Sequence, residues 1–226
     1  SLEQAKLGKG ASPKFQGKIV MITGGSGTIG FAIAEAFSKL GAQTILVDKD
    51  EIALKESVTK LGVGHKYFPI DVTHSDAANQ AMLAAINNFG GLDILISNAG
   101  AAHAGPMLGI SNEELRNAFE LNFFSHYSFS TEAAKILKDQ NRGGQILFNI
   151  SKQAVNPGKN FGAYGLPKAT TFFLMRQLAL ELGPDGIRVN GINADRIRSG
   201  LLTDDFISSR AKSRGVSESD YMAGNL

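Results

Sequence analysis

The sequence predicts an α/β protein in which helices cover both faces of a doubly wound parallel sheet. Short apolar runs alternate with longer segments that carry apolar side chains at helical spacing. Strands joined through helices run parallel, with right-handed crossovers. The chain of 226 residues is long enough for one such domain and too short for two of ordinary size.

Six apolar runs are expected to be strands, which is the number of a doubly wound sheet with strand order 3-2-1-4-5-6. They cover residues 17–23, 44–47, 66–70, 92–96, 145–150 and 187–192. Helices are expected over residues 31–40, 51–61, 76–89, 112–137 and 165–182. Residues 201–225 resemble a mobile pair of helices that covers a ligand, with a plain surface pair as the alternative.

Composition excludes several classes of protein. The 23 Lys and Arg residues nearly balance 21 Asp and Glu, and no basic run forms a nucleic-acid footprint. There is no cysteine for a disulfide, a thiol nucleophile or a thiolate metal site. No apolar stretch reaches the roughly 18 residues of a membrane span, and no signal peptide opens the chain. We therefore expect a cytoplasmic protein, and no metal site, because the four histidines lie far apart.

A glycine-rich turn follows the first expected strand and opens the first helix. Gly25, Gly27 and Gly30 form the pattern G-x-G-x-x-G, which alone is weak but gains weight from this strand-turn-helix context. Residues without a Cβ let a pyrophosphate approach the backbone, and the helix N-terminus supplies free N–H groups. The sequence thus predicts a Rossmann-like domain that binds a dinucleotide.

Asp48 ends the second expected strand, where a carboxylate can accept hydrogen bonds from the adenosine ribose hydroxyls and repel a 2′-phosphate. This favours NAD over NADP as the cofactor. Lys49 argues in the other direction, since a cation there could partly accommodate a phosphate. A solvated Asp at a turn is the alternative interpretation.

Tyr164 and Lys168 lie four residues apart, so a helix places both side chains on one face. An ammonium near a phenol stabilises the phenolate and lowers its pKa toward acid–base work. Ser151 follows the fifth expected strand, at the sheet edge where ligands bind, and its hydroxyl could hold a substrate oxygen. The alternatives are a chance helical spacing and a serine that caps a turn.

In these residues the chain resembles the short-chain dehydrogenase/reductase family, from Gly17 to about Ser199. Each matching motif is modest alone, but together, in order and at the family's spacing, they are highly specific. The matching residues are the glycine loop 23–30, Asp71, Asn98-Ala99-Gly100, Asn122, Ser151, Tyr164 and Lys168.

The resemblance implies a role for each of these residues. Tyr164 would be the general acid/base, and Lys168 would lower its pKa and hold the nicotinamide ribose. Ser151 would orient the substrate oxygen, and Asn122 would place a water in the proton relay. The residues expected to contact NAD are Gly24, Ser26, Gly27, Thr28, Ile29, Gly30, Asp48, Asp71, Val72, Asn98, Ala99, Gly100, Tyr164, Lys168 and Ser199.

The chain departs from the family pattern at four places. Thr28 stands where compact members have Gly, and Ser97 replaces the first Asn of Asn-Asn-Ala-Gly. Residues 194–195 are Ala-Asp where Pro-Gly is usual, so the turn on the nicotinamide side differs in sequence from the family pattern. Pro167 would be costly within a helix, so we expect the helix to begin at residues 162–164 and Pro167 to lie in its first turn.

The two ends suggest a domain cut from something longer. Residues 1–16 are expected to be an extension or a junction, and residues 17–226 a single NAD-binding catalytic domain. The family usually adds a helix and a seventh strand, which are missing here, so we expect the natural protein to continue and the last strand to be an open edge. Family members commonly associate through their long helices, and a homo-oligomer is expected.

The expected substrate is a small hydroxylated or anionic molecule, because residues 152–160 at the site's rim are unusually polar. Together with residues 193–195, this stretch resembles the dehydrogenase half of bifunctional rhamnulose-phosphate aldolase/lactaldehyde dehydrogenases. An aldolase would then precede the N-terminal junction. Two other functions stay open, a non-catalytic NAD-binding sensor and an NAD-dependent epimerase or dehydratase acting on a sugar.

Overall fold

The computed structural model describes residues 13–102, 104–195, 197 and 203–223. Its centre is one sheet of six parallel strands in the order β3-β2-β1-β4-β5-β6. The predicted fold class and strand order are therefore confirmed. The strands are β1 (Ile19–Thr23), β2 (Gln43–Asp48), β3 (Lys66–Pro69), β4 (Ile94–Ser97), β5 (Gly144–Asn149) and β6 (Ile187–Ile192).

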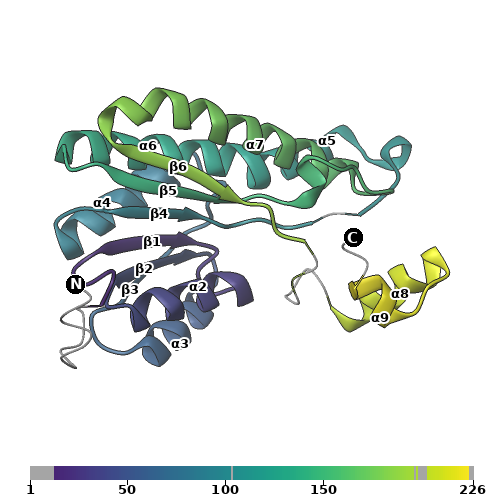
Figure 1. The fold of residues 1–226 in the computed structure, drawn as a ribbon, viewed down its shortest axis with the longest axis horizontal. Helices are drawn as coiled ribbons and strands as arrows, with labels where there is room; N and C mark the ends of the chain where they lie inside the picture. The colour runs from purple at the N-terminus through teal and green to yellow at the C-terminus, as the bar shows by residue number, and fades with distance from the viewer. Residues whose placement is uncertain (1–12, 103, 196, 198–202, 224–226) are drawn as a thin grey trace, which may run out of the picture.

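The helices form two layers, one on each face of the sheet (Figure 1). One layer holds α2 (Thr28–Lys39) and α3 (Glu51–Leu61), and the other holds α4 (Ala77–Phe89), α5 (Asn112–Phe119), α6 (Ser125–Gln140) and α7 (Gly162–Leu182). Three short 3₁₀ turns, η1 (Met107–Gly109), η3 (Lys152–Ala154) and η4 (Gly183–Asp185), lie in the connections. The helix pair α8 (Asp204–Arg214) and α9 (Glu218–Ala223) lies beyond the carboxyl ends of the strands (Figure 1).

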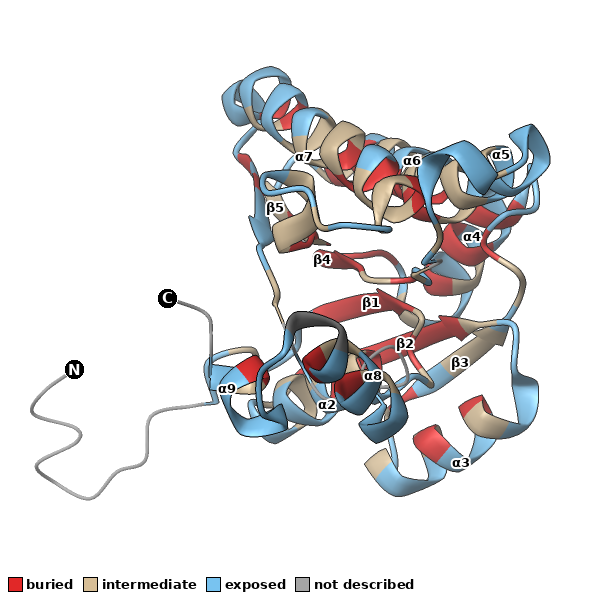
Figure 2. Ribbon diagram, turned by 90° about the vertical axis from the view of Figure 1, so that its right-hand side faces the viewer, coloured by how far each residue is buried: buried red, intermediate tan, exposed pale blue. Residues whose placement is uncertain are grey.

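Alternating strand residues supply the two cores. Met21 of β1 belongs to the cluster under α4, α6 and α7, while its neighbours Val20 and Ile22 belong to the cluster under α2 and α3. The central strands are consequently buried on both faces (Figure 2), which explains why they appear in the sequence as continuous apolar runs.

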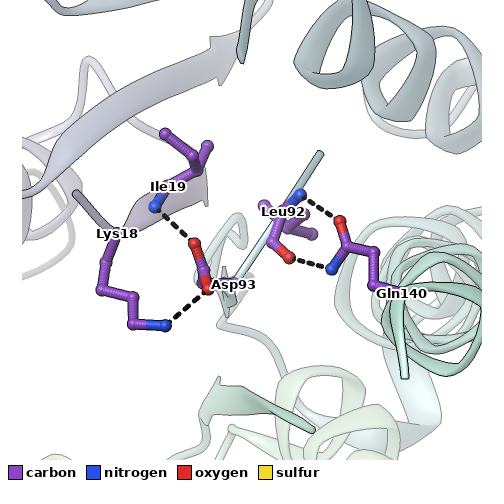
Figure 3. A network of polar contacts seen from close by, with 5 residues as sticks. All are labelled: Lys18, Ile19, Leu92, Asp93 and Gln140. Atoms are coloured by element: carbon purple, nitrogen blue, oxygen red, sulfur yellow. Dashed lines mark hydrogen bonds and ion pairs between the residues drawn. The ribbon is translucent and has the colours of Figure 1, made fainter. Parts of the chain in front are cut away.

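Two polar side chains, Asp93 and Gln140, connect the elements where the central strands begin (Figure 3). The carboxylate of Asp93 accepts hydrogen bonds from Lys18 Nζ at 2.7 Å and from the Ile19 N–H at 3.0 Å, which ties β1 to β4. The amide of Gln140, at the end of α6, pairs with the N–H and carbonyl of Leu92 at 3.0 and 2.6 Å. These contacts fix the start of β4 relative to β1 and to the end of α6.

The long helix predicted over residues 112–137 is not continuous. A π-helical turn, η2 (Glu120–Phe124), separates α5 from α6. The hydroxyl of Thr171 on α7 donates to the backbone carbonyl of Asn122 in this turn at 2.7 Å. Such π turns are frequent at functional sites, and this one carries Asn122.

Helix α7 begins at Gly162, within the predicted range. Pro167 is nevertheless the sixth residue of the helix, so its predicted place in the first turn is wrong. The proline has no N–H to donate to the carbonyl of Ala163. Its ring is buried, so packing offsets part of the lost hydrogen bond.

Two further expectations concern the ends and the membrane. Strand β6 is an edge of the sheet within the described residues, as expected, and its side chains past Val189 are exposed. None of the described helices is both long and apolar enough to cross a lipid bilayer.

Candidate active site

A cleft of about 680 Å³ opens over the carboxyl ends of the strands. This volume falls within the roughly 300–1,000 Å³ typical of ligand sites. Thirteen of the fifteen residues expected to contact NAD line it; Ser26 does not, and Ser199 lies outside the described residues. The thirteen are Gly24, Gly27, Thr28, Ile29, Gly30, Asp48, Asp71, Val72, Asn98, Ala99, Gly100, Tyr164 and Lys168.

The glycine loop passes too close to its neighbours for side chains at two positions. A Cβ on Gly30 would lie 2.1 Å from the carbonyl oxygen of Gly24, and one on Gly25 would lie 2.8 Å from Leu46. Gly24 itself has a φ of +64°, a conformation that favours glycine. Tight packing brings the first turn of α2, with its unpaired N–H groups, to the wall of the cleft.

Gly27 is the N-cap of α2 and provides no side-chain cap. The backbone N–H groups of Thr28, Ile29 and Gly30 have no carbonyl four residues back within the helix, and all three residues line the cleft. Together with the positive end of the helix dipole, they form a site suited to a pyrophosphate. The cleft thus fits a dinucleotide.

Two carboxylates, Asp48 at the end of β2 and Asp71 just after β3, line the cleft. Asp48 accepts hydrogen bonds from the N–H groups of Ser26 at 3.3 Å and Lys49 at 2.8 Å, so the side chain is held against the glycine loop. Ser26 therefore acts on this site through its backbone. Hydrogen bonds from Thr73, first from its backbone and then from its hydroxyl, lower the pKa of Asp71.

Asn98 links three strands beneath the cleft. Its side-chain amide donates to the carbonyls of Thr23 and Gly24 at 3.0 and 3.3 Å, and its oxygen accepts from the amide of Asn149 at 2.8 Å. The hydroxyl of Thr23 accepts from the backbone N–H groups of Asn98 and Ala99. These contacts hold the ends of β1, β4 and β5 in one arrangement.

Tyr164 stands where the cleft meets a second cavity of about 240 Å³, and it lines both. Ser151 also lines the second cavity, next to the phenol of Tyr164. Burial raises the pKa of Tyr164, and the hydrogen bond from Ser151 opposes this effect. A lowered pKa was expected from Lys168; that expectation is wrong for this arrangement, because desolvation of the phenol is the dominant effect.

Lys168 is buried beneath Tyr164, with its Nζ 5.8 Å from the centre of the phenol ring. The ammonium donates to the backbone carbonyl of Asn149 at 3.0 Å, and it lies 3.4 Å from Nε2 of His126. Burial lowers the pKa of Lys168 to about 8. The predicted pairing of Tyr164 and Lys168 on one helix face is thus present.

Asn122 lies behind the cleft, in the π turn. Its amide donates to the carbonyls of Ala101 and Ala118 at 3.0 and 3.1 Å, while its Oδ1 is buried and accepts no hydrogen bond within the described residues. A Cβ placed on Gly100 would lie 2.8 Å from this Oδ1 and 3.4 Å from Lys168 Nζ. The orphaned oxygen and the ammonium therefore face the same point.

The second cavity adjoins the polar segment that the sequence analysis placed at the rim. Lys152 pairs with Asp195 at 3.0 Å across this cavity's wall, and the side chain of Gln153 accepts from the N–H of Gly158 at 2.7 Å. The helix pair α8–α9 contributes Phe206, Arg210 and Tyr221 to the lining. The predicted rim segment and the covering helix pair thus both lie at this cavity.

Sequence reasoning missed four residues around the catalytic candidates. The backbone carbonyl of Asn149 accepts a hydrogen bond from Lys168, and the hydroxyl of Thr171 donates one to the carbonyl of Asn122. Ser97 and His126 form a buried pair, with 2.6 Å between Oγ and Nδ1. The departure at Ser97 was visible in the sequence. Its partner on α6 was not, because residues 97 and 126 are distant along the chain.

The comparisons with known proteins agree with this geometry. The family model described as short chain dehydrogenase matches residues 18–206. The chain therefore belongs to the short-chain dehydrogenase/reductase family, whose members are oxidoreductases that act on alcohol and carbonyl groups.

Three curated relatives show the range of this family. The chain is 33% identical to the uncharacterized oxidoreductase YuxG of Bacillus subtilis, over 83% of the chain and 28% of the relative. It is 34% identical to the 7alpha-hydroxysteroid dehydrogenase of Escherichia coli, over 84% of the chain and 74% of the relative. Identity is 30% to the galactitol 2-dehydrogenase of Agrobacterium fabrum, over 79% of the chain and 70% of the relative. The chain thus spans under a third of the first relative's length.

Among solved structures, the chain is similar to the 3-ketoacyl-(acyl-carrier-protein) reductase from Brucella melitensis complexed with NADH. The TM-score is 0.82 and the identity 26%, over 93% of this chain and 90% of that one. The similar fold and the NADH in that structure agree with a dinucleotide cleft here.

Proposed function

We propose that this chain is an NAD-dependent oxidoreductase that interconverts a small hydroxylated alcohol and its carbonyl compound, with Tyr164 as the general acid/base. The observation that carries the proposal is the position of Tyr164. Its side chain lines both the dinucleotide-sized cleft and the smaller cavity, with Ser151 next to it in the smaller cavity and the Lys168 ammonium 5.8 Å from the centre of its ring.

The bound cofactor supplies hydride transfer to and from the substrate carbon. The first turn of α2 would hold the pyrophosphate with the N–H groups of Thr28, Ile29 and Gly30. Lys168, whose ammonium borders the cleft, would hold the nicotinamide ribose. Ser199 would meet the carboxamide.

The proton of the reaction would pass through the phenol of Tyr164. In the oxidation of an alcohol, Tyr164 accepts the hydroxyl proton, and in the reverse direction it donates a proton to the carbonyl oxygen. Ser151 orients that oxygen. The ammonium of Lys168 favours the charged phenolate once the proton has been taken. The orphaned Oδ1 of Asn122 would accept from a water that carries the proton onward.

NAD, rather than NADP, is the proposed cofactor. Asp48 lines the cleft and is held there by the N–H groups of Ser26 and Lys49. Its carboxylate can accept from ribose hydroxyls and would repel a 2′-phosphate. Lys49 also lines the cleft, and its side-chain ammonium is the feature that argues for some tolerance of a 2′-phosphate.

The proposed substrate is small and polar. The second cavity, of about 240 Å³, is smaller than the roughly 300–1,000 Å³ of sites for drug-sized ligands. The ion pair of Lys152 with Asp195 and the side chains of Gln153 and Asn156 make one wall polar. This wall suits lactaldehyde or a short polyol better than a steroid.

A fusion to an aldolase is the finer form of this proposal. It rests on the resemblance of residues 152–160 and 193–195 to the dehydrogenase half of rhamnulose-phosphate aldolase/lactaldehyde dehydrogenases. None of the relatives named above is an aldolase. The 28% share of the Bacillus subtilis relative that the chain matches shows that such a segment occurs within a longer protein.

Tyr164→Phe tests the proposed function. Removal of the proton donor is expected to lower turnover by roughly 10²–10⁴-fold, with NADH affinity little changed. Tyr127→Phe is the matched control, since Tyr127 is half exposed on α6 and lies outside both cavities. The assay is NADH absorbance with a panel of lactaldehyde, short polyols and a hydroxysteroid.

The outcomes separate the three functions. NADH that accumulates in proportion to product, and is lost in Tyr164→Phe, supports the oxidoreductase. Product formed without net NADH indicates an epimerase or dehydratase. Tight NADH binding with no turnover across the panel indicates a sensor module and contradicts the proposal.

A further inference from the structure

Three buried polar side chains lie in a row behind the cleft, and each comes from a different element. Ser97 ends β4, His126 lies in α6 and Lys168 in α7, and each is at most 2% exposed. The serine Oγ is 2.6 Å from Nδ1 of the imidazole, and the imidazole Nε2 is 3.4 Å from the ammonium. None of the roles proposed above uses Ser97 or His126.

The imidazole in this row is neutral. Burial, and then the charge of Lys168, hold the pKa of His126 well below its usual range, while a hydrogen bond to the backbone of Ala99 acts in the opposite direction. A neutral imidazole has one N–H and one lone pair, and an ammonium has only donors. His126 therefore meets Lys168 with its lone pair on Nε2 and carries its proton on Nδ1, beside Ser97.

The other neighbours of the ammonium define its direction. The carbonyl of Asn149 on β5 accepts from Nζ at 3.0 Å, and the ring of Tyr164 lies 5.8 Å away on the same helix. A Cβ on Gly100 would lie 3.4 Å from Nζ, so the ammonium borders the cleft there. The Asn149 carbonyl and the His126 imidazole accept two of the three N–H groups of the ammonium, so the third N–H of Lys168 is left to point into the cleft.

We propose that His126 is a positioning residue that, with its proton held on Nδ1 by Ser97, serves as the second acceptor for Lys168 and keeps the ammonium charged and aimed into the cleft. The inference rests on the proposed function for the identity of the ligand, NADH. The arrangement of Ser97, His126 and Lys168 does not depend on the proposed function, because it follows from contacts between the sheet and the two long helices. An ammonium with fewer acceptors in a buried place loses its proton more readily.

The test compares His126→Leu, which removes the acceptor, with His126→Gln, which can return an oxygen near the position of Nε2. NADH affinity is measured by fluorescence titration as a function of pH, and kcat and KM are measured in parallel. In His126→Leu the alkaline loss of NADH binding is expected to move about one pH unit lower, which is roughly a tenfold loss of affinity on the alkaline side. His126→Gln is expected to recover much of that shift.

Two additional variants make the result specific. Ser97→Ala removes the partner that holds the proton on Nδ1, so it is expected to shift the same profile in the same direction by less, even if His126→Leu does not fold. His65→Gln is the control, because His65 is also buried but contacts Ser38 and Thr44 at the other edge of the sheet.

The inference is overturned if folded His126→Leu or Ser97→Ala binds NADH with the wild-type pH profile, or if the leucine and glutamine variants at 126 behave alike. An absence of turnover in the wild type, with normal NADH binding, contradicts the proposed function but leaves the binding profiles as a test of His126. The two failures are therefore distinguishable.

Discussion

The hydroxyl of Thr171 on α7 donates to the backbone carbonyl of Asn122 at 2.7 Å, and both residues are buried. This bond joins the helix that carries Tyr164 and Lys168 to the π turn that carries Asn122. It gives the Asn122 carbonyl a side-chain donor from another helix. The hydrogen bond thus helps to fix the distance between the two halves of the candidate catalytic site.

Thr171→Val keeps the shape of the side chain and removes this donor. Loss of one buried hydrogen bond costs about 0.5–1.5 kcal/mol, so the free energy of unfolding is expected to fall by that amount. Urea unfolding measures it. Thr170→Val is the matched control, since the hydroxyl of Thr170 bonds only to the previous turn of the same helix, at Leu166. Equal losses in both variants would contradict the bridging role.

Glycines 27 and 30 belong to the same sequence motif but differ in their surroundings. A Cβ on Gly30 would lie 2.1 Å from the Gly24 carbonyl oxygen, whereas one on Gly27 would lie 3.4 Å from that atom. Gly30→Ala is therefore expected to destabilise the fold by about 1–3 kcal/mol or more and to abolish NADH binding. Gly27→Ala is expected to keep the fold. Thermal unfolding with and without NADH measures both; similar melting temperatures would show that the loop relaxes around Gly30.

Cofactor choice is expected to depend on Asp48. Asp48→Asn removes the charge and keeps one oxygen, which can still accept from the N–H of Lys49 or of Ser26 but not from both, because these two bonds go to different carboxylate oxygens. The ratio of kcat/KM for NAD to that for NADP is expected to fall by about tenfold, or roughly 1.4 kcal/mol. The control is Asp50→Asn, which alters the N-cap of α3 outside the cleft. A ratio equal to that of the wild type would leave cofactor choice to other residues.

A buried histidine makes stability depend on pH. The N–H of Thr44 donates to Nδ1 of His65 at 3.2 Å, so the proton is on Nε2, 2.9 Å from the hydroxyl of Ser38. Burial lowers the pKa of His65 in the folded protein, so below pH of about 6.5 the unfolded chain binds more protons. Stability is therefore full above that pH and falls as the pH drops, by up to about 1.4 kcal/mol per pH unit.

In His65→Gln this acid loss is expected to be smaller than in the wild type, although the variant is less stable at neutral pH. His126, buried with a lowered pKa, contributes the same slope to each protein. His74→Gln, at an exposed loop position, serves as the control. Urea unfolding between neutral pH and about pH 5 gives the slopes. An unchanged slope in His65→Gln would show that its protonation is not linked to folding.

Much of the site could be predicted from the sequence, because the motifs that mark it are local. Gly30 follows a buried strand at the spacing of a dinucleotide loop, and Asp48 ends the next strand. Tyr164 and Lys168 lie one helical turn apart. In a parallel sheet such strand ends meet at one edge, which is why residues spread over the chain line one cleft.

Other predictions were wrong because they used local sequence rules for features that depend on tertiary contacts. The prediction of one continuous helix over residues 112–137 missed the π turn at Asn122, which Thr171 of the distant helix α7 contacts. Pro167 lies in the second turn of its helix because a buried ring compensates for a missing donor. The pKa of Tyr164 is raised because burial outweighs the opposing effect of the Ser151 side chain, and burial is a property of the folded chain.

The glycine turn and the spacing of the tyrosine and lysine were determined by the sequence alone, because each depends on residues within one or two turns of each other. The strand order followed from the alternation of strands and helices along the chain. Only the tertiary structure decided the charge state and direction of Lys168. Its ammonium is buried and is met by Asn149 from β5 and His126 from α6, and a pKa depends on the groups that surround a charge in space.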